Sequence, residues 1–539
     1  MKYALDGAPN TTIRRQTTQS LCACRRRHPL LQLTKQRRVP VTSKPTRGSI
    51  IVRRPLLLLV LMAQFWTSAC QQHIVLNRGK PTPIDIADHS PGRHTPAGEP
   101  FNSEPTLTIG NTPDAGPVHY AVDYTYVGSL DLTATKPSLS KCEQFSPLSF
   151  QGNGFRPLTY VPTGTCMNGE VDLYETNDSS YVVQAGGTFA AFALTDITDP
   201  TNPSFVGGWK WNPPTNTIDL RSFRQGTRRL LALAMESTNY GNGTASPCGI
   251  AIVDVTDANI PILVRNLHGT AIGSDASWCN VHTIQVASDN NGNGQFMLVA
   301  SKDTSDLHVL DISNLENIRE VNTFSHPHPS FDQHGRLNSF VQDTTVAGKR
   351  IYVSFWAGGV IVVDKQKLFA GAQPEAFMLT PPDGISPAHF KASHSFPTAD
   401  GNYLFVQDFA NFIPGYSQIR LFDIHVLAQP REVYEFEYEQ TLSPPHLMTV
   451  YEDLLFVSWY LDGIRVFKLN VGDMKHASVD LVAFQRVREE NATSSFTIDH
   501  FGGIVDLVVS PCRVRTQTKT CIYASDMTHG LLILTFEGI

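Results

Sequence analysis

The sequence predicts an all-β fold, a seven-bladed β-propeller built of four-stranded antiparallel blades. Three observations support this prediction. A short apolar strand motif recurs seven times at a spacing of roughly 50 residues, which is typical of solenoids and propellers. Each copy has the same strand-like neighbours, so each unit holds four short strands, as a propeller blade does. Long amphipathic helical patterns are scarce, whereas short runs rich in Val, Ile, Tyr and Phe are frequent.

The repeated motif is an apolar strand that often starts with Gly and ends with Asp. One copy, "GIAIVD", begins at Gly249, and another, "GVIVVD", begins at Gly359. The remaining copies begin at Ala191, Asp306, Gln418, Gly463 and Gly530. An Asp that follows a strand accepts backbone N–H bonds and thereby caps the next turn. We therefore assign a structural role, and not that of a metal ring, to Asp196, Asp254, Asp311, Asp364 and Asp423.

Within each unit we expect this motif to be the third strand. An apolar second strand precedes it, such as "FMLVAS" from Phe296, and a first strand comes earlier, such as "VHTIQVA" from Val281. An extended segment such as "FVGGWKW" from Phe205 follows as the fourth strand. The last unit reaches Ile539 directly after its third strand. We expect residues 123–132, "DYTYVGSLDL", to supply the missing N-terminal strand and close the ring, because closure removes exposed strand edges.

Charge divides the chain into two parts of opposite sign. Residues 1–54 contain 13 Lys and Arg and one acidic residue, whereas the rest contains 30 Lys and Arg and 48 Asp and Glu. An acidic body repels phosphate backbones, so the composition argues against nucleic acid as a partner. We interpret the basic segment 1–54 either as an over-extended translation start or as an Arg-rich transit segment.

Residues 55–70 predict export. An apolar run from Leu56 to Ala63 is too short to span a bilayer comfortably, but it fits the core of a signal peptide. Small residues then precede Cys70, an order that resembles the bacterial lipobox, in which the Cys is lipidated and becomes the mature N-terminus. Thr67 departs from that pattern, which prefers Leu, so ordinary secretion with cleavage nearby stays open. The expected location is extracytoplasmic, either anchored to a membrane by lipid or secreted.

A polar linker and six cysteines follow Cys70. Residues 71–117 are rich in Pro, Gly, His, Ser and Thr and predict a flexible tether before the propeller of residues 118–539. An even number of cysteines in an exported chain suggests disulfides. Six cysteines allow fifteen pairings, so proximity in the sequence is the only guide. It favours three pairs: Cys512 with Cys521, Cys142 with Cys166, and Cys248 with Cys279.

Several third strands continue into a turn of recurring composition. The stretches "GIAIVDVTD", "LHVLDIS" and "AFALTDITDP" resemble the LVIVD repeat, and the resemblance covers the chain from about residue 120 to residue 539. It implies a β-propeller of bacterial or archaeal cell surfaces, in a family mostly without assigned activity. Lys468 and Thr535 replace the terminal Asp in the last two units, so that Asp is not required in every blade.

A histidine heads the first strand in three units, at His282, His394 and His446. The first strand of every propeller blade lines the central channel, so equivalent positions converge near the axis. The fourth unit places Asn338 there, with His334 a short step upstream. The other units place polar residues there in a register that the sequence leaves open: Glu170, Asp219 or Arg221, and His500 or Asp506.

Two interpretations of this imidazole-rich ring stay open. Neutral imidazoles from separate blades can bind a transition metal ion, as in the carotenoid oxygenases and the selenium-binding proteins, which this chain resembles only in layout. Alternatively, the histidines bond only water and backbone carbonyls in a wet channel. No nucleophile elbow, Walker loop or dinucleotide fingerprint occurs in a suitable context. The sequence therefore favours a binding or scaffold module for an unknown protein or small-molecule ligand over a metal-dependent enzyme.

Overall fold

A computed structural model describes most of the chain beyond residue 130. The described residues are 131–135, 148–163, 168–187, 190–236, 247–270, 277–301, 304–327, 339–379, 390–409, 418–437, 443–471, 477–489 and 503–538. The basic segment, the signal-like segment with Cys70 and the tether lie outside them, as do Cys142, Cys166, His334, Asn338 and His500. Among the described residues, no helix combines the length and the apolar character needed to cross a membrane.

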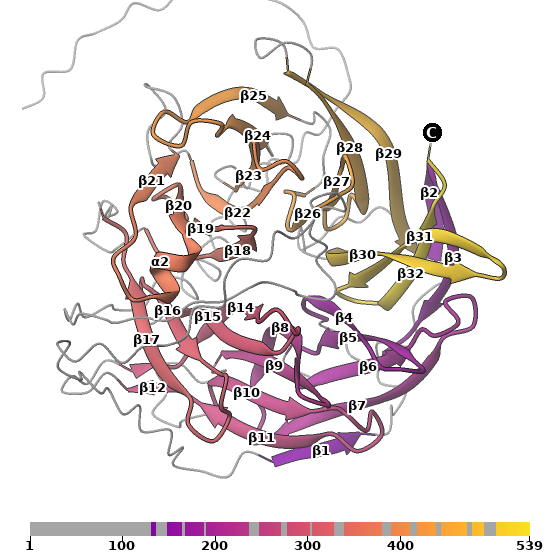
Figure 1. Cartoon of the computed structure of the whole chain (residues 1–539). Helices are drawn as coiled ribbons and strands as arrows, with labels where there is room; N and C mark the ends of the chain where they lie inside the picture. Colours follow the sequence, from indigo (N-terminus) through magenta and orange to yellow (C-terminus); the bar gives the residue numbers. More distant parts are fainter. Residues whose placement is uncertain are drawn as a thin grey trace, which may run out of the picture. The chain divides into compact units, whose positions relative to one another are not determined.

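Seven antiparallel blades form a β-propeller, as the sequence predicts (Figure 1). Blade 1 contains β4 (Val171–Glu175), β5 (Ser180–Ala185), β6 (Phe192–Asp196) and β7 (Ser204–Asn212). Blade 2 contains β8 (Asn216–Gln225), β9 (Arg228–Glu236), β10 (Gly249–Asp254) and β11 (Ile262–Leu267). Blade 3 contains β14 (Val281–Ser288), β15 (Gly294–Ser301), β16 (Leu307–Asp311) and β17 (Arg319–Phe324).

The C-terminal blades repeat this order. Blade 4 contains β18 (Asp343–Ala347), β19 (Arg350–Ser354), β20 (Val360–Asp364), the short helix α2 (Lys365–Phe369) and β21 (Ala376–Leu379). Blade 5 contains β22 (Ala392–Pro397), β23 (Tyr403–Asp408), β24 (Gln418–Asp423) and β25 (Arg431–Glu437). Blade 6 contains β26 (Met448–Tyr451), β27 (Leu454–Ser458), β28 (Ile464–Val471) and β29 (Ala477–Glu489). Blade 7 contains β30 (Ile504–Val514), β31 (Gln517–Asp526) and β32 (Gly530–Phe536).

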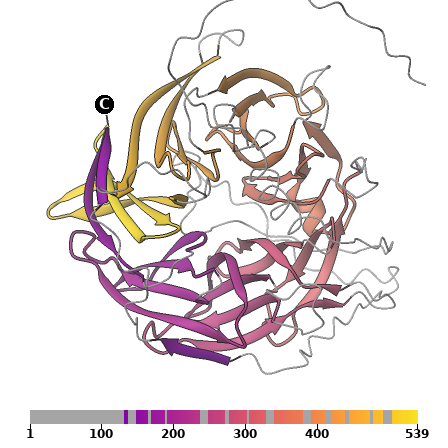
Figure 2. The same cartoon turned by 180° about the vertical axis from the view of Figure 1, so that it is seen from behind.

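An N-terminal strand completes blade 7, but it is not the one that the sequence analysis chose. The fourth strand is β3 (Phe155–Val161), which pairs with β32 and places Tyr160 opposite Leu532 (Figure 2). Pro157 makes this segment a poor strand candidate, because proline cannot donate a ladder hydrogen bond. In the structure the register shifts at Pro157, so the proline lies at a bulge where the ladder is already interrupted.

The segment expected to close the ring lies elsewhere. Its last two residues, Asp131 and Leu132, belong to β1 (Asp131–Thr135), which pairs with β7 as a fifth strand on blade 1. Another added strand, β2 (Leu148–Asn153), pairs with β29 on blade 6 and continues almost directly into β3. A two-stranded sheet of β12 (Gly269–Thr270) and β13 (Ser277–Trp278) stands apart from the blades.

Most of the hydrophobic core of the described residues lies in seven apolar layers, one between each pair of neighbouring blades. Successive side chains of a strand point to opposite faces, so one strand serves two layers. In β9, Leu231 and Leu233 pack toward blade 1, whereas Leu230 and Ala232 pack toward blade 3. Both faces of a blade are therefore buried, which explains why the second and third strands are continuously apolar rather than alternating.

The first strand of each blade lies innermost, as predicted. Each of these seven strands contacts the first strand of both neighbouring blades, and the contact between β30 and β4 closes the circle. Figure 1 shows them arranged around a common centre. The polar residues that these strands carry are therefore brought together at the axis. The innermost strands are β4, β8, β14, β18, β22, β26 and β30.

Candidate functional site at the propeller axis

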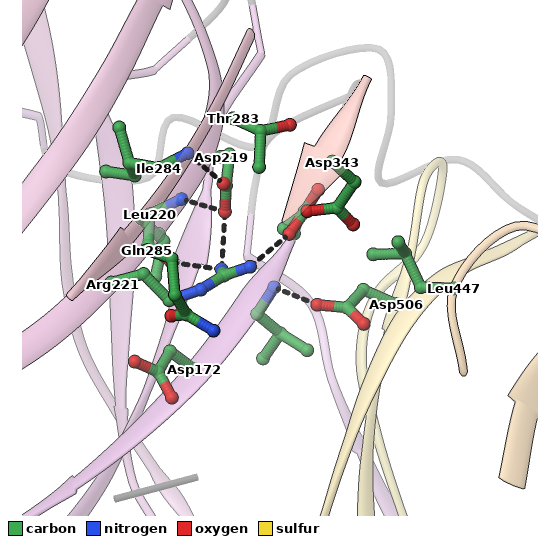
Figure 3. A network of polar contacts seen from close by, with 12 residues as sticks. Asp172, Asp219, Leu220, Arg221, Thr283, Ile284, Gln285, Asp343, Leu447 and Asp506 are labelled. Atoms are coloured by element: carbon green, nitrogen blue, oxygen red, sulfur yellow. Dashed lines mark hydrogen bonds and ion pairs between the residues drawn. The ribbon is translucent and has the colours of Figure 1, made fainter. Parts of the chain in front are cut away.

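A single arginine, Arg221 on β8, lies at the centre of a buried polar network (Figure 3). Its side chain is only 1% exposed. One terminal nitrogen, Nη2, donates to Glu170 Oε2 at 3.0 Å, and the other, Nη1, forms an ion pair with Asp219. Two further buried carboxylates, those of Asp172 and Asp506, also interact electrostatically with this guanidinium. Four acids from blades 1, 2 and 7 thus surround one cation.

Burial sets the protonation behaviour of this network. Desolvation raises the pKa of Asp219 well above its usual range, and the nearby Glu170 carboxyl adds to the rise, although Arg221 opposes it. Desolvation also raises the pKa of Asp172, again against the effect of Arg221. Burial alone would lower the pKa of Arg221, but the carboxylates of Asp219 and Glu170 outweigh burial and raise it. The arginine stays charged, and the carboxyls of Asp172 and Asp219 take up a proton more readily than they would in water.

The acids of this network also join neighbouring blades. Asp172 Oδ2 accepts a hydrogen bond from Ser222 N of blade 2 at 2.7 Å. Asp219 Oδ2 accepts from Ile284 N of blade 3 at 2.8 Å. Asp506 Oδ2 accepts from Val171 N of blade 1 at 3.1 Å. Each carboxylate therefore satisfies a backbone donor that the next blade presents toward the axis.

The predicted residue His282 follows the same bridging pattern. Its Nδ1 atom lies 3.0 Å from Glu236 Oε1 of blade 2, and its Nε2 atom lies 2.7 Å from Gln342 Nε2 beside blade 4. The Gln342 amide nitrogen is a donor, so Nε2 must accept and Nδ1 must carry the proton toward Glu236. Neighbouring Thr283 donates to the Gln342 carbonyl at 2.9 Å. His282 thus links three consecutive blades.

His394 is buried, with 1% of its side chain exposed. Its Nδ1 atom accepts a hydrogen bond from Met448 N of blade 6 at 3.1 Å. Its Nε2 atom lies 3.3 Å from Thr345 Oγ1 and 3.6 Å from Asp343 Oδ2, both on blade 4. Because Nδ1 accepts, the proton of the neutral ring lies on Nε2. His394 thus joins blade 5 to both of its neighbours.

His446 precedes β26 and lies against blade 7. Its Nδ1 atom is 2.6 Å from the carbonyl oxygen of Val505, and its ring lies against Tyr460 with the centroids 4.8 Å apart. Ser458 donates to the same carbonyl at 2.8 Å. Three histidines at one phase of the repeat therefore serve three different junctions between blades.

The structure describes only some of the residues that were predicted to form the metal site. Within the described part of the chain, no group of three or more His, Cys, Asp or Glu side chains is arranged to hold a metal ion. His334 and Asn338, which the sequence analysis included in the site, lie outside that part. A metal ion at the axial histidines therefore stays a prediction. The contacts of His282, His394 and His446 show what the sequence pattern missed, namely that each ring bonds to protein groups of adjacent blades.

Sequence reasoning found some members of the axial network and missed others. Glu170, Asp219, Arg221 and Asp506 were among the residues that the first-strand phase placed near the axis. Asp172 on β4 was missed. The available signal was its position two residues after Glu170, which places both acids on the same face of an extended chain.

The acids after the third strands cap turns, as predicted. Asp196, Asp254 and Asp311 accept from the backbone N–H two residues later, at 2.9 to 3.0 Å. Asp423 does the same for His425 at 3.1 Å. Asp364 caps helix α2 by accepting from Lys367 N at 2.7 Å. None of these contacts requires a metal ion.

Two of the three expected cysteine pairs are disulfide-bonded in the structure. Cys512 and Cys521 join β30 to β31, with Cα atoms 5.6 Å apart. Cys248 and Cys279 join blade 2 to the segment before β14, with Cα atoms 5.1 Å apart. The third expected pair, Cys142 with Cys166, lies outside the described residues.

Comparison with known proteins finds distant structural similarities. No family model and no curated protein matches this chain. Similar solved structures include Raptor of Chaetomium thermophilum, with 13% identity and a TM-score of 0.44 over 75% of this chain and 31% of that one. This chain thus spans less than a third of the length of the Raptor chain.

Two further structures are similar at the same level. A putative 6-phosphogluconolactonase of Bacteroides fragilis shares 12% identity, with a TM-score of 0.40 over 68% of this chain and 97% of that one. The Cps50 (Swd1) β-propeller domain of Myceliophteria thermophila shares 14% identity, with a TM-score of 0.35 over 60% of this chain and 86% of that one. Similarity at this level assigns no function to the chain.

Proposed function

We propose that this protein is an exported cell-surface β-propeller, anchored by lipid at Cys70, that acts as a binding or scaffold module. The observation that carries the export proposal is the pairing of Cys248 with Cys279 and of Cys512 with Cys521. Structural disulfides persist in oxidising compartments and are rare in the cytosol. The apolar run before Cys70 and the resemblance to the LVIVD repeat support the same location.

The contacts at the axis support a binding role over catalysis. Buried polar groups there are occupied in joining blades: Asp219 holds Ile284 N, and His394 holds Met448 N. Such a network rigidifies a scaffold, because each member satisfies another. A metal-dependent enzyme that uses the axial histidines is the alternative, and it requires His282 or His394 to exchange these partners for an ion.

The anchor is tested by labelling cells with a clickable palmitate analogue. We expect the full-length protein to incorporate the label and to fractionate with membranes. The Cys70→Ala variant should lose both properties, whereas Cys24→Ala, which removes another N-terminal cysteine, should keep them. An unlabelled protein whose fractionation does not change on Cys70→Ala would refute the anchor, and its recovery from the medium would point to ordinary secretion.

Elemental analysis of the purified protein separates the two functional classes. The binding module predicts no stoichiometric transition metal. One bound ion per chain that disappears in His282→Ala and in His394→Ala, but not in His425→Ala on the outside of blade 5, would establish the enzyme alternative instead.

A further inference from the structure

The hairpin between β8 and β9 carries an unusual concentration of positive charge. Its sequence "RQGTRR" places Arg224, Arg228 and Arg229 within six residues. Beyond residue 54 the chain is acidic, with 48 Asp and Glu against 30 Lys and Arg. A cluster of three arginines in an acidic body therefore calls for a specific explanation.

Two of these arginines lie directly opposite each other. Arg224 on β8 pairs in register with Arg229 on β9. Directly opposed like charges destabilise an antiparallel pair. None of the other six hairpins between a first and a second strand, as far as the structure describes them, opposes two residues of like charge. Folding alone therefore gives no reason for this pair.

The third arginine shows how the chain normally compensates such a charge. Arg228 Nε donates to Asp254 Oδ2 at 2.7 Å. Arg319 and Arg431 pair in the same way with Asp311 and Asp423 in blades 3 and 5. Among the described residues, by contrast, no carboxylate forms an ion pair with Arg224 or Arg229.

The two uncompensated arginines are held in place by neighbouring blades. Arg229 Nε donates to the backbone oxygen of Glu175 in blade 1 at 2.6 Å, which leaves both terminal nitrogens available for other acceptors. On the other side, Gly226 N donates to Asn293 Oδ1 of blade 3 at 2.9 Å. The guanidinium of Arg224 lies against Gly292, where a Cβ atom would approach Nη2 to 3.3 Å. The hairpin tip is thus fixed between blades 1 and 3.

The electrostatic environment agrees with this geometry. Partial burial lowers the pKa of Arg229, and the positive charge of Arg224 lowers it further. Tyr174 and Glu175 act in the opposite direction but do not cancel the effect. An anion that contacts both side chains would relieve this repulsion.

We propose that Arg224 and Arg229 bind an oxyanion, a sulfate or phosphate group that a ligand of this protein presents at the β8–β9 hairpin. This site rests on the proposed binding role and gives it a ligand chemistry. Guanidinium groups match tetrahedral oxyanions because each can donate two parallel N–H bonds. The rigid hairpin lowers the entropy lost on binding.

The test is calorimetric titration of the purified full-length protein at low ionic strength with two probes, inorganic sulfate and a heparin-derived hexasaccharide. Binding of both probes indicates that the free ion suffices, whereas binding of the hexasaccharide alone indicates a glycan-borne sulfate. Arg224→Gln and Arg229→Gln should each weaken binding by about 10- to 100-fold, the range expected for the loss of a charge-assisted hydrogen bond.

Arg228→Gln is the matched control. It removes the same charge from the same hairpin, but from an arginine that Asp254 already compensates. Binding should therefore stay within about threefold of the unmodified protein, because only a screened surface charge changes. Equal weakening by all three substitutions would show non-specific attraction and overturn the site, as would the absence of binding to either probe. Neither result bears on Cys70, so export and anchoring would stand independently.

Discussion

At the scale of single residues, Arg221 decides whether the axis tolerates its buried acids. The side chain and its two ion-pair partners, Glu170 and Asp219, are all less than a tenth exposed. Two charges leave water at great cost unless each finds a partner. The pairing therefore serves to make the burial of Glu170 and Asp219 possible, rather than to add a large surplus of stability.

Replacing Arg221 should consequently be severe. Arg221→Met keeps much of the apolar stem but leaves carboxylates without their cation, and we expect a loss of about 3–5 kcal/mol in the free energy of unfolding. Arg319→Met provides the comparison, because Arg319 is 46% exposed and pairs with Asp311 at the surface. It should cost less than about 1 kcal/mol. Urea denaturation measures both losses. Similar losses for the two variants would contradict the conclusion that Arg221 makes the burial of Glu170 and Asp219 possible.

The raised pKa of Asp219 predicts an uncommon pH dependence. The folded protein holds this proton at pH values where the unfolded chain, with a pKa near 3.9, has released it. The stability that Asp219 contributes is therefore complete below about pH 4 and is lost as pH rises through the folded pKa. Asp219→Asn cannot ionise, so its free energy of unfolding should fall less than that of the unmodified protein between about pH 4 and pH 8.

Asp423 supplies the opposite sign as a control. Hydrogen bonds and charge from His425 outweigh burial and lower the pKa of Asp423. Its contribution is present above the unfolded pKa and is lost as pH falls. Asp423→Asn should thus differ most from the unmodified protein near neutral pH and least in acid. Denaturation curves at several pH values would reject the assignment if the two variants showed the same trend.

At the scale of elements, side-chain hydrogen bonds join the innermost strands to neighbouring blades, beside isolated backbone bridges such as that between Gly187 and Thr217. A sheet ends at its first strand, so the N–H groups that face the axis need acceptors from the adjacent blade. Asp506, Asp172 and Asp219 supply them at the successive junctions of blades 7, 1, 2 and 3. His394 supplies one between blades 5 and 6. The histidine at the head of a first strand is thus a connector in a repeated position.

Loss of one connector should loosen its junction. His394→Ala leaves Met448 N buried without its acceptor and opens a cavity beside Thr345, so we expect a loss of about 2–4 kcal/mol. His425→Ala, at an exposed turn of blade 5, should cost less than about 1 kcal/mol. Hydrogen exchange locates the effect: the Met448 amide should lose protection in His394→Ala only. Unchanged protection there would argue against the bridging role.

At the scale of the whole molecule, β3 converts an open row of blades into a closed ring. Without β3, strand β32 would expose a free edge along its whole length, although its side chains pack in the layers between blades 6, 7 and 1. Exposed edges of this kind promote aggregation. The added strands β1 and β2 extend blades that are already complete, so they contribute less to closure.

Two truncations separate these contributions. A variant without residues 1–147 lacks β1 but keeps β2 and β3, and it should keep the oligomeric state of the full-length protein and one cooperative unfolding transition. A variant without residues 1–163 loses β3 as well and should aggregate or unfold in more than one step. Size-exclusion chromatography and denaturation distinguish them. If both behave alike, closure by β3 is not what stabilises the ring.

The sequence by itself determined the parts of this protein that local pattern controls. The apolar third strand, its apolar neighbour and the capping Asp are set by burial on both faces and by turn chemistry, so the repeat predicted seven blades of four strands. Proximity along the chain likewise predicted the disulfide between Cys512 and Cys521. The phase of the first strand predicted that His394, Arg221 and Asp219 would approach the axis.

Only the tertiary structure decided what depends on partners distant in sequence. The sequence analysis placed residues 123–132 in the closing strand, whereas Phe155–Val161 takes that place in the structure, with Pro157 at a bulge that local propensity does not reveal. Likewise, His282 reads as a metal ligand by residue type, whereas its bonds to Glu236 and Gln342 come from blades before and after its own. Such contacts depend on how neighbouring blades pack against one another. The sequence of any one strand does not determine the free energy of this packing.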